Sequence, residues 1–327
     1  MMLCMLLYRR WLDDAARYWE CFSLPVKISM VTGVLALICA VAIYGWMMHR
    51  WRRQRRYIFC EATDDWLVNQ VIWPAVVYGI VPEKQLAHAP LSEYQYPEYK
   101  QLFIRQLMAY RKSFTGNIPA ILRTVYLRLE LQAGAMAGLY SRQSARVQAS
   151  LKELSGMGVW IDGRFILRLT KSKNEHTRWL ARSYMVQCAP AYPLEFLEEP
   201  GEVLLPWQQF ELSRMVIARE DIPVPLFEKW IDPRYHPTII SFALRLATHY
   251  QQRTAVKVML RLLPVSVETL RIHIIGCLGQ LHVAEVGPLL KGMYEMESSA
   301  CRTAILQAID QINAGAQPGH HGITILR

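Results

Sequence analysis

The sequence predicts an all-α protein in which a single transmembrane helix precedes an α-solenoid of stacked helical pairs. The first observation is a stretch of 21 residues without a charged side chain, from Ile28 to Met48. The second is a basic cluster that follows this stretch at once, and the third is a spacing of 30 or 31 residues between apolar positions over residues 180–301. Helical pairs of this size bury their apolar faces only by stacking on one another, which is the arrangement of an α-solenoid.

The uncharged stretch is long enough to cross a bilayer as a helix. At about 1.5 Å per residue it extends over roughly 31 Å, close to the roughly 30 Å hydrocarbon core of a membrane. A cleaved signal peptide would need a small-residue cleavage site and a less basic flank. Leu35–Cys39 does not form a lipoprotein-type box, because Ile38 precedes the cysteine. The remaining alternative is a helix buried in a soluble core.

Positive charges on both sides of the span predict its orientation. Four basic residues precede it, at positions 9, 10, 17 and 27, and five arginines follow it: Arg50, Arg52, Arg53, Arg55 and Arg56. Because the side richer in Lys and Arg stays in the cytoplasm, we expect a single-pass protein of the bacterial inner membrane with residues 57–327 in the cytoplasm. The margin of five to four leaves the inverted topology open. The five arginines are also candidates for contact with anionic lipid headgroups.

Composition divides the chain into six predicted segments. They are an N-terminal amphipathic segment (1–25), the transmembrane helix (26–48), a basic juxtamembrane collar (49–56), an irregular cap or linker (57–99), a helical repeat domain (100–314) and a flexible tail (315–327). Residues 57–99 are interpreted as irregular because they are acidic and rich in proline and aromatic residues. The seven cysteines are scattered and form no CxxC pair, which favours reduced thiols over a disulfide framework.

The repeat consists of apolar residues that recur within helix-like segments. Its anchors, spaced by 30, 30, 30 and 31 residues, are Leu180, Phe210, Ile240, Leu270 and Cys301. Sixteen residues after the first four anchors lie Phe196, Leu226, Val256 and Val286. Turn-forming residues occupy equivalent stretches between the first and second helices: Pro190 and Pro193, Pro223 and Pro225, and the Gly287-Pro288 pair. Each unit therefore predicts a helix, a short turn and a second helix. Upstream, residues 147–154 and 165–169 predict another such pair. A non-repetitive helical bundle is the alternative.

One unit resembles a known repeat. Residues 267–290 carry Arg271 near the start of the first helix, Leu278-Gly279 at its end and an apolar second helix, and this pattern is similar to a HEAT/armadillo-type repeat. Arg302 matches the arginine of the pattern and Arg178 matches it approximately, whereas Ser241 departs from it. The resemblance extends well over residues 236–313 and less well over 177–235.

This resemblance implies a right-handed solenoid of HEAT-like helical pairs in which Arg271 and Arg302 bond neighbouring repeats. It also implies a scaffold that binds a protein partner, possible examples being inner-membrane enzymes such as glycosyltransferases. Two alternatives stay open. The first is a repeat-protein enzyme of the lyase or metal-dependent hydroxylase type, and the second is a structural oligomer that tethers an assembly to the membrane.

Charge is concentrated in one part of the predicted soluble region. Residues 100–182 contain 15 Lys and Arg against four Asp and Glu. Within this block the candidates for contact with an anionic partner or lipid are Arg164, Arg168, Lys171 and Lys173. Nucleic acid is disfavoured as a partner, because no recognised motif is present and aromatic residues do not interleave with the basic ones.

Motifs for catalysis are not found in the sequence. It contains no phosphate-binding GxxxxGK[ST] loop, no HExxH zinc helix and no GxSxG nucleophile elbow. His273 and Cys277 lie one helical turn apart and could share a metal, but both fall inside the repeat and are interpreted as packing residues. We therefore expect no enzymatic activity, no cofactor, no metal and no catalytic residue.

Overall fold

The computed structural model describes residues 23–78, 89–90, 97–199 and 201–315. These residues form α-helices, 3-10 turns and one π-helical segment, and they contain no strand, so the predicted all-α class is confirmed. The chain divides into two compact units, residues 1–110 and 111–327. The predicted amphipathic segment lies almost entirely outside the described residues, as does the predicted tail after Gly315.

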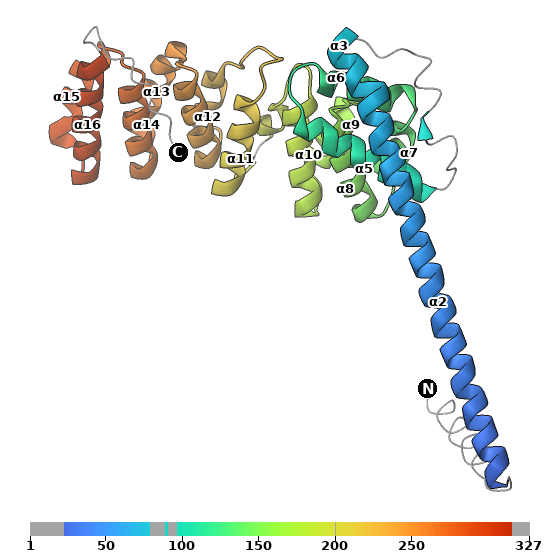
Figure 1. The fold of residues 1–327 in the computed structure, drawn as a ribbon. Helices are drawn as coiled ribbons and strands as arrows, with labels where there is room; N and C mark the ends of the chain where they lie inside the picture. The colour runs from blue at the N-terminus through green and yellow to red at the C-terminus, as the bar shows by residue number, and fades with distance from the viewer. Residues whose placement is uncertain (1–22, 79–88, 91–96, 200, 316–327) are drawn as a thin grey trace. The chain divides into compact units, whose positions relative to one another are not determined.

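The first unit is built on one long helix, α2 (Leu24–Trp66), which continues as a π-helical segment (Leu67–Ile72) and α3 (Trp73–Tyr78). At about 1.5 Å per residue, the 43 residues of α2 extend over roughly 65 Å. Among the described residues, this continuous helix is the one long and apolar enough to cross a membrane. Figure 1 shows α2 in blue as a single uninterrupted ribbon.

The predicted irregular linker over 57–99 is wrong for residues 57–78, which are helical. The reason is packing against α5 (Pro97–Ser113). Phe59 is completely buried and its ring meets that of Tyr99 edge to face, with centroids 4.9 Å apart. About two turns further along α2, the rings of Trp66 and Phe103 are 5.8 Å apart. Phe59 and Trp66 therefore belong to the core of the first unit, whereas Trp73 is 66% exposed.

The second unit begins with α6 (Ile118–Arg128) and α7 (Gln132–Leu139), which precede the repeating part. The predicted upstream pair is present as α8 (Ser144–Met157) and α9 (Gly163–Leu169). Gly158 ends α8 with φ +63°, a left-handed conformation that glycine adopts without a steric penalty.

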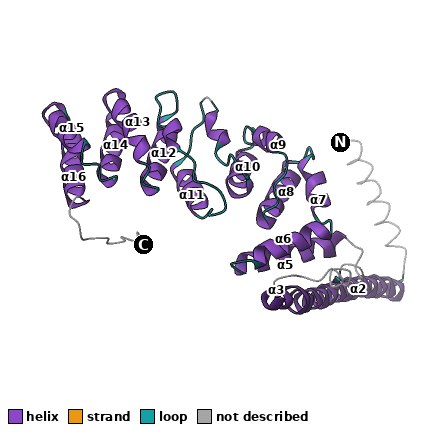
Figure 2. Ribbon diagram, turned by 90° about the horizontal axis from the view of Figure 1, so that it is seen from above, coloured by secondary structure: helices purple, strands orange, loops and turns teal. Residues whose placement is uncertain are grey.

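Five longer helices follow in series. They are α10 (Glu175–Cys188), α11 (Pro206–Ile217), α12 (Pro237–His249), α14 (Glu268–Gln280) and α16 (Ser299–Gly315). Each contacts the next along the series, and α10 also contacts α8. Figure 2 shows these helices in one layer, with α9, α13 (Val256–Leu262) and α15 (Val286–Met293) in a second layer beside them.

The five predicted anchors fall one in each of these five helices, but they do not all lie in the core. Ile240, Leu270 and Cys301 are buried, Leu180 is half-buried and Phe210 is 63% exposed. In α11 the buried face contains Gln208, Gln209, Leu212 and Ser213 instead. Phe210 therefore lies in a helix, as the spacing predicted, but on the exposed face of that helix.

The predicted second helices are only partly present. In the last two full units they are α13 and α15, but in the two units before them they shrink to 3-10 turns, Glu195–Glu198 and Phe227–Trp230. Prolines explain the difference, because proline lacks an N–H and holds the preceding residue in an extended conformation. Pro193 precedes the first turn, and Pro223 and Pro225 precede the second.

Arginines near the starts of three long helices hold the preceding turns in place. Arg178, Arg271 and Arg302 each donate to a backbone carbonyl before their own helix, those of Ser172 (2.9 Å), Ser266 (2.9 Å) and Glu295 (2.7 Å). Arg271 also forms an ion pair of 2.9 Å with Glu297, in the turn that leads into α16. The expected structural role of Arg271 and Arg302 therefore agrees with their contacts.

Two glycines of α14 provide a test of the packing between α14 and α16. A Cβ added to Gly279 would lie 2.7 Å from the Ala308 Cα, whereas a Cβ added to Gly276 would meet no atom within 4 Å. We expect Gly276→Ala to stabilise the protein by about 0.5–1 kcal/mol, the ordinary gain in a helix. Gly279→Ala is expected to destabilise it by about 1–3 kcal/mol through overpacking. Denaturant unfolding measures the change in the free energy of unfolding for each variant. Equal changes in the two variants would contradict the close contact between α14 and α16 at Gly279.

Candidate functional site

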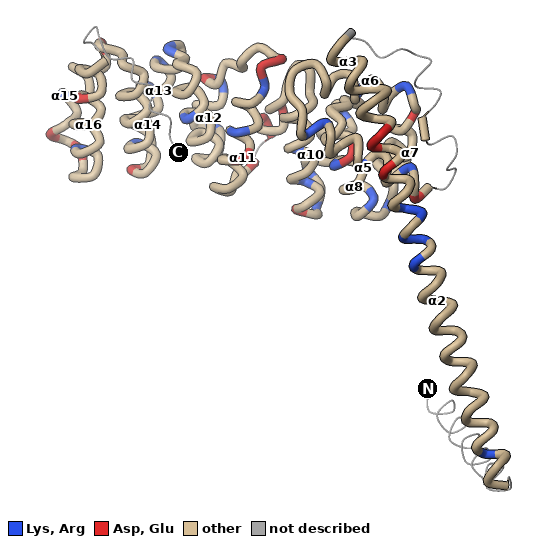
Figure 3. Tube along the Cα trace, in the orientation of Figure 1, with Lys and Arg blue, Asp and Glu red and all other residues tan. Residues whose placement is uncertain are grey.

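The five arginines of the collar (Arg50, Arg52, Arg53, Arg55 and Arg56) are all exposed on α2, directly after its apolar part. Figure 3 shows them in blue on α2, where the largely uncharged ribbon ends. Arg50 lies over the ring of Trp46 at 5.4 Å and Arg55 over that of Trp51 at 3.8 Å. Tryptophan and arginine together are typical of the membrane interface. Arg56 is also paired with Glu98 at 2.7 Å.

The second predicted cluster is less uniform. Arg164 and Arg168 are exposed one turn apart on α9, and Arg168 lies 5.4 Å from the ring of Phe165. Lys171 forms an ion pair of 2.7 Å with Glu199, while Lys173 is exposed in the turn before α10. The structure thus keeps the four residues in one short stretch of the surface but gives one of them an acidic partner. Whether they contact an anionic ligand stays a prediction.

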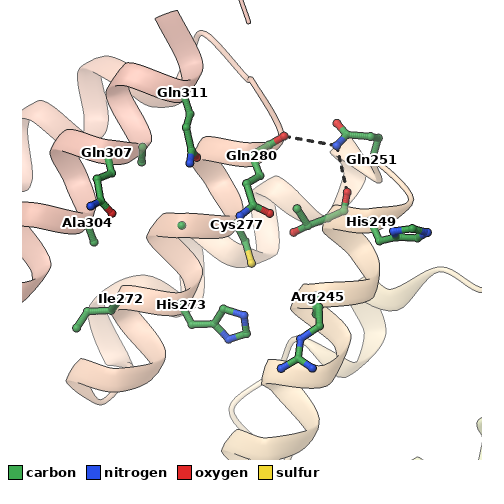
Figure 4. Close-up of a pocket in the computed structure, with 13 residues that line it drawn as sticks. Arg245, His249, Gln251, Ile272, His273, Cys277, Gln280, Ala304, Gln307 and Gln311 are labelled. Carbon is green, nitrogen blue, oxygen red and sulfur yellow. Dashed lines mark hydrogen bonds between the residues drawn. The ribbon is translucent and has the colours of Figure 1, made fainter. Parts of the chain in front are cut away.

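A groove with a volume of about 710 Å³ crosses α12, α14 and α16 (Figure 4). Each helix contributes a stripe of residues three or four positions apart, as expected for one face of a helix. The stripes contain Arg245, Thr248 and His249 on α12, with Gln251 in the turn after it, then Ile272, His273, Gly276, Cys277 and Gln280 on α14, and Ala304, Gln307, Ala308 and Gln311 on α16.

The groove combines small residues with long polar ones. Gly276, Ala304 and Ala308 have little or no side chain, so backbone and buried atoms form much of its surface. Arg245, His249, Gln280 and Gln307 are exposed. The lining residues include four glutamines, one arginine and two histidines but no Asp or Glu. The groove therefore offers many hydrogen-bond donors and acceptors and one fixed positive charge.

Two titratable groups of α14 are shifted by their surroundings. Burial, together with the positive charge of Arg245, lowers the pKa of His273, so this imidazole is neutral at pH 7. Burial raises the pKa of the Cys277 thiol, which Thr248 on the neighbouring helix partly opposes. A protonated thiol of this kind is a weak nucleophile. Among the described residues no three His, Cys, Asp or Glu side chains come together as metal ligands.

The groove was not predicted from the sequence, although one signal pointed to it. Gln251, Gln280 and Gln311 follow one another at intervals of 29 and 31 residues, close to the repeat length. Figure 4 shows these three side chains near the C-terminal ends of their helices. The Gln251 amide donates to the backbone carbonyls of Thr248 (3.1 Å) and Gln280 (3.4 Å), which connects α12 to α14 at this edge.

Comparisons with known proteins add no relative to this description. No protein-family model matches the chain, and a search of curated proteins found no significant match. Over the residues that the structure describes, the fold defines an all-helical protein with one candidate membrane-spanning helix.

Proposed function

We propose that this chain is a membrane-anchored scaffold that holds a protein partner beside the bilayer on a solenoid of HEAT-like helical pairs. The observation that carries the proposal is the continuity of α2. The same helix includes the apolar span, the arginine collar and the buried residues Phe59, Thr63 and Trp66. A helix packed in this way fixes the first unit directly to the anchor, with no loop between them.

The series of helix contacts supports a solenoid. In the second unit each long helix contacts the next in the chain, which is the pattern of a repeat protein whose units pack only on their neighbours. The arginine contacts of Arg178, Arg271 and Arg302 recur at equivalent places, as the resemblance to HEAT/armadillo-type repeats implies. Solenoids present extended surfaces to other macromolecules, and the groove over α12, α14 and α16 is such a surface.

Membrane attachment gives the scaffold its partner class. A binding module fixed to a bilayer meets partners in the same membrane at a raised effective concentration. The arginine collar favours the cytoplasmic side for the helical units, where an enzyme of the bacterial inner membrane is the proposed partner. A glycosyltransferase is the example that we propose for this partner. Identifying the protein that crosslinks to the chain in membranes tests this choice.

Crosslinking in intact membranes tests the function. The full-length chain and a fragment of residues 57–327, which keeps Phe59, Thr63 and Trp66, are expressed side by side, crosslinked and purified. We expect a membrane protein to be recovered with the full-length chain and depleted at least tenfold with the fragment, because only the anchored chain shares its bilayer. Equal recovery of one soluble partner by both would overturn the proposed role of the anchor, provided that circular dichroism shows the fragment to be folded.

A further inference from the structure

We propose that the groove over α12, α14 and α16 binds an extended peptide segment that carries an acidic side chain, and that Arg245 receives its carboxylate. The inference rests on the proposed scaffold function and adds to it the chemistry of the partner. Three features of the groove support it: an arginine without a partner, a row of glutamines and the absence of acidic lining residues.

The arginines of the second unit fall into two groups: those with a partner, and those that no hydrogen bond or ion pair joins to another described residue, such as Arg245, Arg253 and Arg261. Arg182, Arg214, Arg219, Arg234 and Arg271 each pair with a carboxylate, and Arg178 and Arg302 donate to backbone carbonyls. Arg245 is exposed in the groove, and no hydrogen bond or ion pair joins it to another described residue. Figure 4 shows the Arg245 side chain near the ring of His273 on α14, whereas the His249 ring points away from α14. A guanidinium in this position suits a carboxylate, which it can bind through two parallel hydrogen bonds.

The glutamines suit a peptide backbone. A glutamine amide both donates and accepts, as each peptide group does, so it pairs with a backbone whatever its side chains are. Packed helices lie about 8–10 Å apart, and an extended chain advances about 3.3 Å per residue. Gln280 on α14 and Gln307 on α16 therefore match residues about three positions apart in an extended peptide, whereas the Gln251 amide already donates to backbone carbonyls. The three helices together accommodate about six to eight residues.

The charge of the groove selects among peptides. With no acidic lining residue and with His273 held neutral by burial, Arg245 supplies the one fixed charge of the lining. A basic peptide would meet this charge without a compensating carboxylate, whereas an acidic side chain would pair with it. The small surface formed by Gly276, Ala304 and Ala308 lets the peptide approach the helices closely.

Peptide selection tests the inference with the full-length protein in lipid nanodiscs. A random pool of displayed decapeptides is selected for binding, and the best peptide is compared with versions in which each Asp or Glu becomes Asn or Gln. We expect one acidic position to recur, and its neutralisation to weaken binding about 10- to 100-fold, the range for a hydrogen-bonded charge pair. Arg245→Gln is expected to weaken the acidic peptide equally and to leave the neutralised peptide unchanged.

Matched variants separate the groove from general effects. Arg261→Gln removes an exposed arginine of α13 outside the groove lining and is expected to leave all affinities unchanged. The pair Gln280→Ala and Gln307→Ala is expected to weaken acidic and neutralised peptides alike, and circular dichroism checks that each variant is folded. Selection of basic peptides, no selected peptide, or competition by free glutamate as strong as by the peptide would overturn the inference. Because this assay needs no cellular partner, its failure is distinct from failure of the membrane crosslinking.

Discussion

Phe59→Ala is expected to lower the free energy of unfolding of the first unit by about 3–5 kcal/mol, the usual cost of a phenylalanine-to-alanine cavity in a core. The side chain is completely buried and packs edge to face on Tyr99. Hydrogen exchange of the α5 amides, measured with the full chain in nanodiscs, reports this loss locally. The result matters because Phe59 lies only three residues after the arginine collar that follows the candidate membrane span.

Ile58→Ala is the matched control, since Ile58 is the neighbouring residue of the same helix and is 48% exposed. Surface substitutions of this kind change stability by about 0.5 kcal/mol or less. Faster exchange in α5 for Phe59→Ala alone would support the packing of α2 on α5. Equal and small effects of the two substitutions would show that α2 is a free tether, and the proposed rigid connection to the anchor would be lost.

Glu202→Gln is expected to destabilise the second unit by about 3–5 kcal/mol, because it leaves the guanidinium of Arg182 buried without a countercharge. The two side chains form an ion pair of 2.5 Å and are 4% and 14% exposed, respectively. Burial lowers the pKa of Arg182 and raises that of Glu202, in each case against the effect of the partner's charge. Desolvation therefore outweighs the attraction, and the pair is costly to break although it adds little net stability.

Glu198→Gln is the control for this prediction. Glu198 pairs with Lys229, also at 2.5 Å, but both side chains are about half exposed, so the loss is expected to be below about 1 kcal/mol. The double variant Arg182→Met with Glu202→Leu is expected to recover most of the stability, since apolar residues can replace a buried pair at little cost. Chemical denaturation followed by tryptophan fluorescence measures all three. Similar losses for Glu202→Gln and Glu198→Gln would contradict the burial of the Arg182 pair.

The sequence was informative where a single periodic signal decided the structure. The apolar stretch and the arginines after it predicted the position of the long helix, and the 30-residue spacing placed one anchor in each of five successive helices. It was misleading where packing overrode composition. Residues 57–78 were predicted to be irregular partly because of their aromatic residues, but two of those residues, Phe59 and Trp66, pack on α5.

The 30-residue period alone could not predict which second helices form or that α12, α14 and α16 together line a groove. The period predicted helices near Phe196 and Leu226, but neighbouring prolines restrict both segments to single 3-10 turns. Phe210 lies at the position that the 30-residue period gives it, but it is exposed, and the buried face of α11 contains Leu212 instead. The groove joins residues from helices about 30 positions apart, and only the spacing of the glutamines linked them in the sequence.

Site-specific photocrosslinking in intact membranes tests the central claim most directly. A photoreactive phenylalanine analogue is placed at Gln307, in the groove, or at Lys257, which is exposed on α13 outside the groove lining. The scaffold account predicts that the analogue at position 307 crosslinks to one membrane-associated protein and that the analogue at position 257 does not. An excess of the selected acidic peptide is expected to abolish the crosslink at position 307. Identical adducts at both positions, or none at position 307, would contradict the account.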